Sequence, residues 1–291
     1  MQPLNGTKGM NEDAFFRGYG CIPVTISVHF QEGQLVRPGP VKDLEAAIEG
    51  FDEKDNRTWG PVIKAVNELK KQNDATHVIS SGALPVLLKM LDKGDLEFCF
   101  SVSSALAVLM SGKVSKEVAE ALAVAGGADV LFPLFKKMRK LSKAVHSTDA
   151  MMLSTNTLFI LGSMIGAGMG PRILNRGRFG SFVDSLSDPE SGIRVNSLFC
   201  IRMTILENPE IWADHRSCLP DVLSMLEDED GDVRKEAGEI AEALIDLRLV
   251  HWGEIMKWLP EKDERAECAR NIVRQSLIKV MEEARAVEGY A

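Results

Sequence analysis

The sequence predicts an all-α protein built as a solenoid of stacked helical repeats, and three observations support this prediction. LSDPESGIRVNSLFCI (186–201) and LEDEDGDVRKEAGEIA (226–241) share an initial Leu, an acidic turn and an apolar-Arg pair at an offset of 40 residues. Apolar segments with helical spacing recur every 40 to 51 residues, which is the range of two- and three-helix repeats. Only 6% of the residues are aromatic, whereas long β-sandwiches draw more heavily on them.

Each predicted unit consists of a short helix, a Leu-rich helix and a longer apolar helix. The Leu-rich helices end at Leu91, Phe135, Leu186 and Leu226. The longer helices are LEFCFSVSSALAVLM, DAMMLSTNTLFILGSMI, GIRVNSLFCIRMTIL and GDVRKEAGEIAEALIDL, and their apolar residues recur with helical spacing. Three glycines stand where a short helix has to end: Gly82, Gly127 and Gly177. We expect at least four units over roughly residues 60 to 250, stacked around one continuous core.

Two kinds of segment resemble known repeats. ATHVISSGALPVLLKML and SKEVAEALAVAGGADVLFPLF resemble the armadillo repeat, and LEDEDGDVRKEAGEIAEAL resembles the related HEAT repeat. The resemblance covers about two-thirds of the chain and implies a right-handed α-α superhelix. It implies no single function, because this family contains adaptors, transport receptors, chaperone cofactors and a few enzymes.

The two ends of the chain differ from the repeats, so the sequence predicts three regions. Residues 1–50 contain CIPVTISVHF, which alternates like a strand, and then a short helix in VKDLEAAIEGF. We therefore expect an N-terminal arm or small hairpin plus a short helix. Residues 51–260 hold the armadillo/HEAT-like repeats. Residues 261–291 contain a strongly helical charged segment that suits a C-terminal capping helix.

Arg194 and Arg234 occupy the same position just inside the third helix of two successive units. A guanidinium at this position can reach turn carbonyls or an acidic side chain in the neighbouring repeat. Binding of a ligand is the alternative. A structural role is favoured because the arrangement recurs, whereas ligand sites usually occur once.

Composition indicates a soluble protein. Hydrophobic residues make up 45% and charged residues 26%, and the formal charge of −8 argues against broad affinity for nucleic acid. The first 20 residues have no apolar core of the kind that signal peptides carry. The most apolar stretch, Met151 to Met169, is interrupted by Ser, Thr, Asn and Gly and is too polar to span a bilayer. We expect a cytoplasmic protein without membrane contact.

Motifs of catalysis and metal binding are missing from the sequence. It has no Walker A motif, no H-E-x-x-H, no G-x-S-x-G and no C-x-x-C, and its five histidines and five cysteines lack metal-ligand spacing. We expect reduced cysteines, no catalytic residue, no metal site and no cofactor. LGSMIGAGMGPR is rich in glycine, but these glycines end an apolar helix. Close packing and a turn therefore explain them better than a phosphate loop.

Positive charge is concentrated between residues 136 and 178. This segment has eight basic residues against one acidic residue, which leaves −15 for the rest of the chain. We expect KKMRKLSK to form a loop between a second and a third helix, with the later arginines at an opposite turn. The acidic turn at residues 227–232 lies on the same rim but two repeats away, so we expect an external acidic partner to pair with the basic loop. The candidate residues are Lys136, Lys137, Arg139, Lys140, Lys143, Arg172, Arg176 and Arg178.

Armadillo transport receptors hold extended peptides with a Trp/Asn ladder on the concave face of their third helices. Residues at the matching positions here are Ala107 with Ser111, Phe159 with Ser163, and Phe199 with Met203. Only the first unit keeps an Asn, Asn67, so the resemblance does not extend to the ladder. An apolar groove lined by Phe159, Phe199 and Met203 is what these positions predict instead.

From these features the sequence predicts a non-enzymatic scaffold or adaptor that binds a protein partner through the concave face. The partner is expected to be acidic or to offer an extended apolar segment. The alternative is a solenoid that binds nucleic acid or a phosphate-rich ligand through the basic segment, 136–178. A solenoid enzyme ranks third, because no cluster of acidic and aromatic residues marks an active site.

Overall fold

A computed structural model describes residues 38–71, 75–112 and 115–256, together with positions 271, 274, 275, 278 and 282. Within these residues every regular element is helical and there is no strand. The predicted N-terminal arm lies outside the described residues up to position 37, and so does the predicted capping helix apart from the five isolated positions. Nothing in the fold therefore tests these two predictions.

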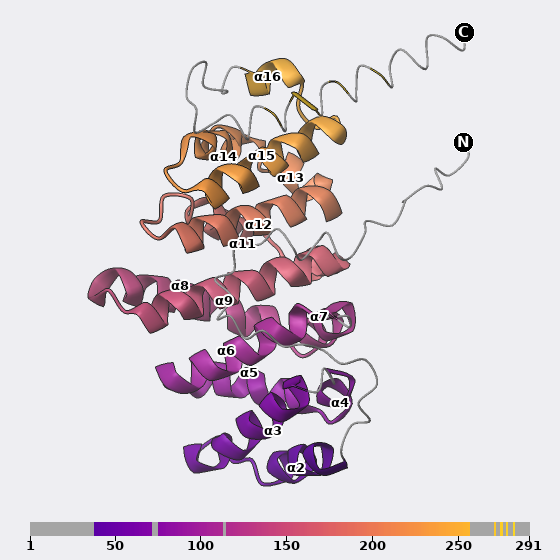
Figure 1. Ribbon diagram of the computed structural model, residues 1–291, viewed down its shortest axis with the longest axis vertical. Coiled ribbons are helices and arrows are strands. Elements are labelled where there is room, and N and C mark those ends of the chain that lie inside the picture. Colours follow the sequence, from indigo (N-terminus) through magenta and orange to yellow (C-terminus); the bar gives the residue numbers. More distant parts are fainter. Residues whose placement is uncertain are drawn as a thin grey trace, which may run out of the picture. The chain divides into compact units, whose positions relative to one another are not determined.

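The described chain consists of four three-helix repeats that stack in successive layers (Figure 1). First helices are α4 (Ala75–Ser80), α7 (Ser115–Val124), α10 (Gly170–Ile173) and α13 (Pro209–Ala213). Second helices are α5 (Ala83–Lys93), α8 (Gly127–Val145), α11 (Arg176–Val183) and α14 (Leu219–Ser224). Third helices are α6 (Leu96–Met110), α9 (Thr148–Met164), α12 (Ser191–Glu207) and α15 (Gly231–Asp246). The predicted all-α solenoid of at least four repeats is confirmed.

Further helices flank and connect the repeats. The helices α2 (Pro38–Glu49) and α3 (Trp59–Lys71) precede them, and α16 (Trp252–Met256) follows. Three short 3₁₀ turns, Asn56–Thr58, Arg216–Cys218 and Met225–Glu227, join elements, and a π-helical turn, Ile165–Met169, extends α9. The short helix expected before Gly50 is present as α2. It begins at Pro38, since proline is tolerated in the first turn of a helix.

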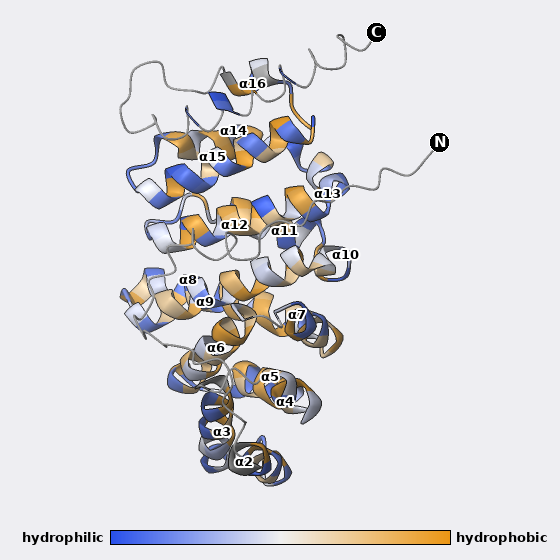
Figure 2. Ribbon diagram, turned by 45° about the vertical axis from the view of Figure 1, so that its right-hand side comes forward, coloured by the Kyte–Doolittle hydropathy of each residue, from blue (hydrophilic) through white to orange (hydrophobic). Residues whose placement is uncertain are grey.

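The third helices form the centre of the stack. Helix α9 packs between α6 and α12, and α12 packs between α9 and α15. Residues Ile193–Ile205 of α12 are buried without interruption. A helix enclosed by neighbours needs no polar stripe, so its amphipathic pattern is weak. Figure 2 shows hydrophobic segments in successive layers, including α6, α9 and α15.

Polar caps define where several helices begin. The side chains of Asp95, Ser147, Asn175 and Asp230 each accept a backbone N–H from the first turn of α6, α9, α11 and α15. Such a cap contributes about 1 kcal/mol because the first N–H groups of a helix have no intrahelical partner.

The predicted glycine stops are confirmed at one position out of three. Gly82 has a φ of 74° and separates α4 from α5. In the next repeat the left-handed residue is Gly126, with a φ of 82°, one position before the predicted Gly127. Gly127 is still required, because a Cβ there would lie 2.8 Å from the carbonyl oxygen of Leu122. The prediction for Gly177 is wrong, since this residue lies inside α11 and the chain turns at Leu174 and Asn175 instead.

The recurring arginines fasten the turns before the third helices. Arg194 donates to the carbonyl oxygens of Asp188 and Pro189 at 2.8 and 3.0 Å. Arg234 makes the same two contacts forty residues later, to Asp228 and Glu229 at 2.6 and 2.9 Å. Arg194 also donates two hydrogen bonds to the Asp228 carboxylate of the next repeat. The structural interpretation of these arginines is confirmed.

Candidate partner-binding surfaces

The basic segment is part of a helix, so the predicted loop is wrong. Helix α8 has 19 residues, whereas α5, α11 and α14 have 11, 8 and 6. It continues through KKMRKLSK because lysine, leucine and arginine favour helices and no helix breaker interrupts them. The chain turns only at His146, which has a φ of 49°.

Two of the five basic residues in α8 are paired within the chain. Arg139 Nε lies 2.6 Å from the Asp188 carboxylate, and Lys143 Nζ lies 3.0 Å from the same oxygen. A second guanidinium nitrogen of Arg139 donates to the carbonyl oxygen of Asp184. The expectation that only an external partner could pair with this segment is therefore wrong for Arg139 and Lys143. Asp188 lies in the turn before α12, and its side chain is buried.

The other three basic residues of α8 remain on its surface. Lys136, Lys137 and Lys140 are exposed, and none of them forms an ion pair with any residue in the described part of the chain. Spacings of three and four residues place Lys136, Lys140 and Lys143 along one side of the helix. Lys136, Lys137 and Lys140 are therefore the basic residues of α8 that are exposed and have no ion pair in the described chain.

The later arginines lie at the other end of the second helices. Arg178 forms an ion pair with Asp129 in the first turn of α8, donates to the carbonyl oxygen of Ile173 and lies over the Phe132 ring. Arg178 is therefore a packing residue, whereas Arg172 and Arg176 are exposed.

The basic segment therefore forms two separate groups. Arg178 contacts the start of α8 at Asp129, and Asp188 contacts its later half at Arg139. Lys136 lies seven residues beyond Asp129, and Lys143 lies fourteen beyond it. At 1.5 Å per residue this corresponds to about 10 to 21 Å along the helix. The basic residues therefore do not form one continuous cluster along α8.

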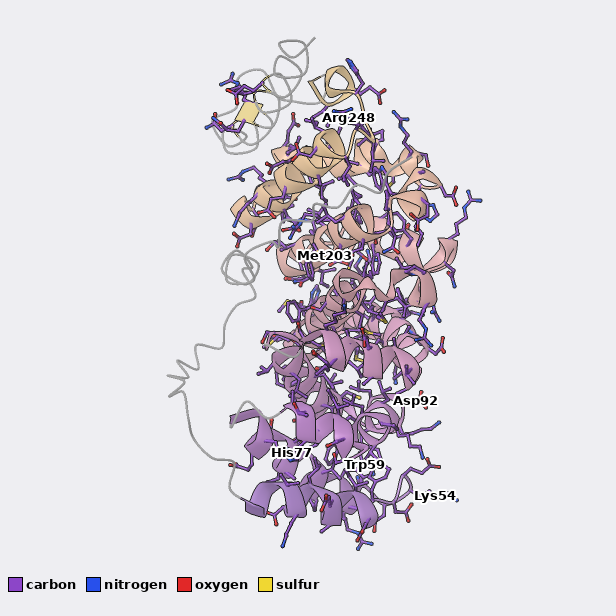
Figure 3. All side chains as sticks on the ribbon, turned by 90° about the vertical axis from the view of Figure 1, so that its right-hand side faces the viewer. Lys54, Trp59, His77, Asp92, Met203 and Arg248 are labelled. Atoms are coloured by element: carbon purple, nitrogen blue, oxygen red, sulfur yellow. The ribbon has the colours of Figure 1, made fainter. Side chains whose placement is uncertain are left out.

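The predicted apolar anchors are buried. Phe159, Phe199 and Met203 expose 7%, 1% and 2% of their areas. The Phe159 and Phe199 rings stack with centroids 6.0 Å apart, across the contact between α9 and α12. Figure 3 shows Met203 among the stacked helices, whereas Lys54 and Asp92 project at the edge. The prediction of an open groove lined by these three side chains is therefore wrong, because neighbouring helices enclose α12 on all sides.

A part-buried polar contact joins α6 and α9. Asn156 Nδ2 lies 3.2 Å from Ser103 Oγ and 3.1 Å from Ser104 Oγ. No other hydrogen bond of the Asn156 side chain is formed within the described residues, so its Oδ1 is an available acceptor. The match to the Trp/Asn ladder did not indicate Asn156. It lies three positions before Phe159, and the ladder has no residue at that position.

We use the name third-helix surface for seven uncharged, at least partly exposed side chains that lie on α6, on the residue that caps its end and on α9. They are Ser104, Ala107, Ser111, Met152, Thr155, Asn156 and Ser163. Ser163, a predicted site residue, belongs to this surface. Asn67, another predicted site residue, is half-buried on α3.

The glycine-rich segment serves packing and a turn. A Cβ at Gly162 would lie 2.5 Å from the Phe199 ring, and a Cβ at Gly170 would overlap the Asn208 side chain. Gly168 has a φ of 84° and lies within the π-helical turn. These close contacts agree with the packing interpretation preferred from the sequence.

A buried ion pair links α12 to α15. Arg202 Nε lies 2.6 Å from a Glu236 carboxylate oxygen, and another nitrogen lies 3.4 Å from Glu239. Burial raises the pKa of Glu236 to about 7, against the opposing effect of Arg202. No local sequence pattern indicates this pair, because Arg202 and Glu236 lie thirty-four residues apart in the chain.

The described cysteines and acidic residues form no reactive or metal-binding cluster. Within the part of the chain that the structure describes, no group of three His, Cys, Asp or Glu could hold a metal ion. Burial raises the pKa of Cys99 to about 11 and that of Cys218 to about 12, and it also raises the pKa of Cys200. A thiol in such surroundings is a poor nucleophile.

One continuous helical stretch among the described residues, Thr148–Ile173, has the length and hydropathy of a membrane span. Helices α7 and α8 meet the same criteria only when taken together across a 90° bend. Thr148–Ile173 contains α9 and is 61% buried, and a core helix meets these criteria equally well.

Comparison with known proteins identifies the fold. No family model matches the sequence, and no curated protein matches it. Among solved structures, a designed armadillo repeat protein in complex with the peptide (KR)4 is similar, with a TM-score of 0.61 and 17% identity. The match covers 80% of this chain and 99% of that one. Another designed armadillo repeat protein, made for modular peptide recognition, has a TM-score of 0.59 and 18% identity, with the same coverage. The chain therefore has an armadillo-like repeat fold.

Proposed function

We propose that the protein is a non-enzymatic scaffold that binds a segment of a partner protein on its third-helix surface. The observation that carries this proposal is the Asn156 side chain. Its amide nitrogen is held by Ser103 and Ser104, which fixes the orientation of the carbonyl oxygen. An oriented, available acceptor can receive a main-chain N–H from an extended segment, and main-chain recognition tolerates many sequences.

The surroundings of Asn156 suit such a segment. The third-helix surface consists of small polar side chains, one alanine and one methionine. Exposed Glu97 and Asp149 lie seven residues before Ser104 and Asn156, so they flank it on the same sides of α6 and α9. Methionine adapts its shape to different apolar groups and is frequent on surfaces that bind several partners. The two similar designed proteins support the same general role, since one was made for peptide recognition and the other binds (KR)4.

A display selection tests the proposal. The full chain is immobilised, and peptides from an unbiased library are enriched and synthesised with a fluorescent label. Binding is then compared between the wild type, Ala107→Arg on α6 and Ala47→Arg on α2. Both alanines are half-buried on helices, so the two variants differ chiefly in position.

We expect Ala107→Arg to weaken binding by about tenfold or more, because the long side chain covers the surface beside Asn156. Ala47→Arg should bind like the wild type. The proposal is wrong if the enriched peptides bind both variants equally well, or if the library yields no peptide that binds.

A further inference from the structure

The end of α8 projects beyond its neighbours. Leu134, Met138, Leu141 and Val145 follow one another along one side of the helix, with spacings of four, three and four residues. The first two are buried, Leu141 is half-buried and Val145 is 62% exposed. The shorter second helices on either side therefore do not reach the last turn of α8. Figure 1 shows this end of α8 extending past the adjacent layers.

The projecting end combines exposed apolar and positive groups. Lys137, Leu141 and Val145 succeed each other at intervals of four residues, and Lys140 and Ala144 lie beside them. Lys137 and Lys140 have no ion-pair partner in the described chain, whereas the next repeat pairs with Arg139 and Lys143 through Asp188. Within α8 the fold thus pairs Arg139 and Lys143 with Asp188, and it leaves Lys136, Lys137 and Lys140 without an ion pair in the described chain.

We propose that this α8 end, residues 136–146, binds an acidic segment of a partner protein that also carries an aliphatic side chain. Three unpaired lysines within five residues attract carboxylates, and the surrounding chain is strongly acidic, so the local potential differs in sign from its surroundings. The aliphatic side chain of the partner covers Leu141 and Val145, which are otherwise exposed to water.

The same geometry disfavours a nucleic acid as the ligand. A phosphate backbone is long and uniformly charged, whereas the unpaired lysines span little more than one helical turn. Exposed acidic residues flank them, with Asp149 at the start of α9 and Asp92 and Asp95 around the preceding turn. A short acidic segment can place its few carboxylates over the lysines without extending onto these flanking acids.

The α8 end is independent of the proposed third-helix surface, because it belongs to a second helix. The probe is a fluorescent peptide of repeated Glu-Glu-Leu units. Its comparators are Ser-Ser-Leu and Glu-Glu-Ser repeats of the same length and a short oligothymidylate. Binding is measured on the full chain at low ionic strength, where charges are weakly screened.

The test variant is the triple substitution Lys136→Ser, Lys137→Ser and Lys140→Ser. The control variant, Lys64→Ser, Arg172→Ser and Arg176→Ser, removes three exposed basic residues elsewhere and has the same net charge. We expect the test variant to bind the Glu-Glu-Leu peptide about tenfold more weakly, and the control to bind it like the wild type. Val145→Ser should weaken the binding of the Glu-Glu-Leu peptide and leave the binding of the Glu-Glu-Ser peptide unchanged.

Three outcomes would overturn the proposal. Equal losses in the two triple variants would mean that net charge alone attracts the peptide. If the oligothymidylate bound more tightly than the Glu-Glu-Leu peptide, the site would be one for phosphate. If the Glu-Glu-Ser peptide bound as tightly as the Glu-Glu-Leu peptide, there would be no aliphatic contact. Methyl NMR of the wild type is a check that needs no substitution. The Leu141 and Val145 signals should shift when the Glu-Glu-Leu peptide is added. If the α8 end did not bind the Glu-Glu-Leu peptide, the result of the display selection would still stand, because that experiment tests residues of the third-helix surface.

Discussion

The Arg194 guanidinium donates two hydrogen bonds to the Asp228 carboxylate of the next repeat, at 2.8 and 2.7 Å. One repeat earlier the equivalent carboxylate, Asp188, pairs with Arg139 of a second helix. Arg194 is the fourth residue of α12, and the fourth residue of α9 is Met151, which carries no charge for this contact. The longer α8 therefore supplies from a different helix the arginine that α9 lacks.

Loss of the Asp228 carboxylate should destabilise the protein strongly. Arg194 and Asp228 expose 7% and 8% of their side chains, so Asp228→Ala leaves a buried positive charge without its partner. We expect the free energy of unfolding to fall by about 3–5 kcal/mol. Chemical denaturation measures this change. The control is Glu254→Ala, which breaks the exposed pair with Arg216 and should cost less than about 1 kcal/mol. Equal effects would contradict the structural role of Arg194.

Gly162 should not tolerate a side chain. A Cβ there would lie 2.5 Å from the Phe199 ring, in a core where helices α9 and α12 enclose both residues. We expect Gly162→Ala to destabilise the protein by about 1–3 kcal/mol, because overpacking displaces the ring. Gly180→Ala in α11 is the matched control, since a Cβ there meets no atom within 4 Å. It should stabilise the protein by about 0.5–1 kcal/mol. Thermal unfolding that ranks the two variants the other way would refute this packing.

Glu236 should make stability depend on pH. Burial raises its pKa from 4.5 to about 7 in the folded chain. Between these values the unfolded chain has released the proton and the folded chain has retained it, so the free energy of unfolding falls as pH rises. Above pH 7 the contribution is constant. Glu236→Gln keeps an acceptor for Arg202 and removes the titration, so its advantage over the wild type should grow from pH 5 to pH 7. Parallel stability curves for the two proteins would contradict the raised pKa.

The three described cysteines should resist alkylation. Burial raises the pKa of Cys99 to about 11 and that of Cys218 to about 12, so their thiolate fractions are very small at neutral pH. Cys200 is fully buried and its pKa is raised as well. We expect iodoacetamide to label these residues only in denaturant, as measured by mass spectrometry of the corresponding peptides. Rapid labelling of the native protein at any of them would show that the repeats open readily.

Local patterns allowed much of the fold to be predicted. The forty-residue offset relates Arg194 to Arg234, and the fold places the two guanidinium groups on equivalent turn carbonyls. Helical spacing likewise predicted the longer apolar helices. These features depend on nearby residues, and a repeat multiplies the signal because every unit has to solve the same packing problem.

Contacts between repeats were harder to predict. The run of charges from Lys136 to Lys143 suggested a loop, but a helix accommodates it because its apolar residues keep the helical spacing. Phe199 was expected to be exposed, yet stacking on Phe159 and contact with Gly162 bury it. Sequence spacing gives the face of a helix on which a residue lies. It does not give the neighbour that covers that face.

The most direct test of the central claim is methyl NMR of the full chain with a peptide from the display selection. Methionine methyl groups report on several parts of the structure: Met152 belongs to the third-helix surface, whereas Met138 is buried in α8 and Met225 lies near α14. If a partner segment binds beside Asn156, the Met152 signal shifts on addition of the peptide and the Met138 and Met225 signals stay in place. An unchanged Met152 signal, with bound peptide and shifts confined to the other methionines, would contradict the proposed function.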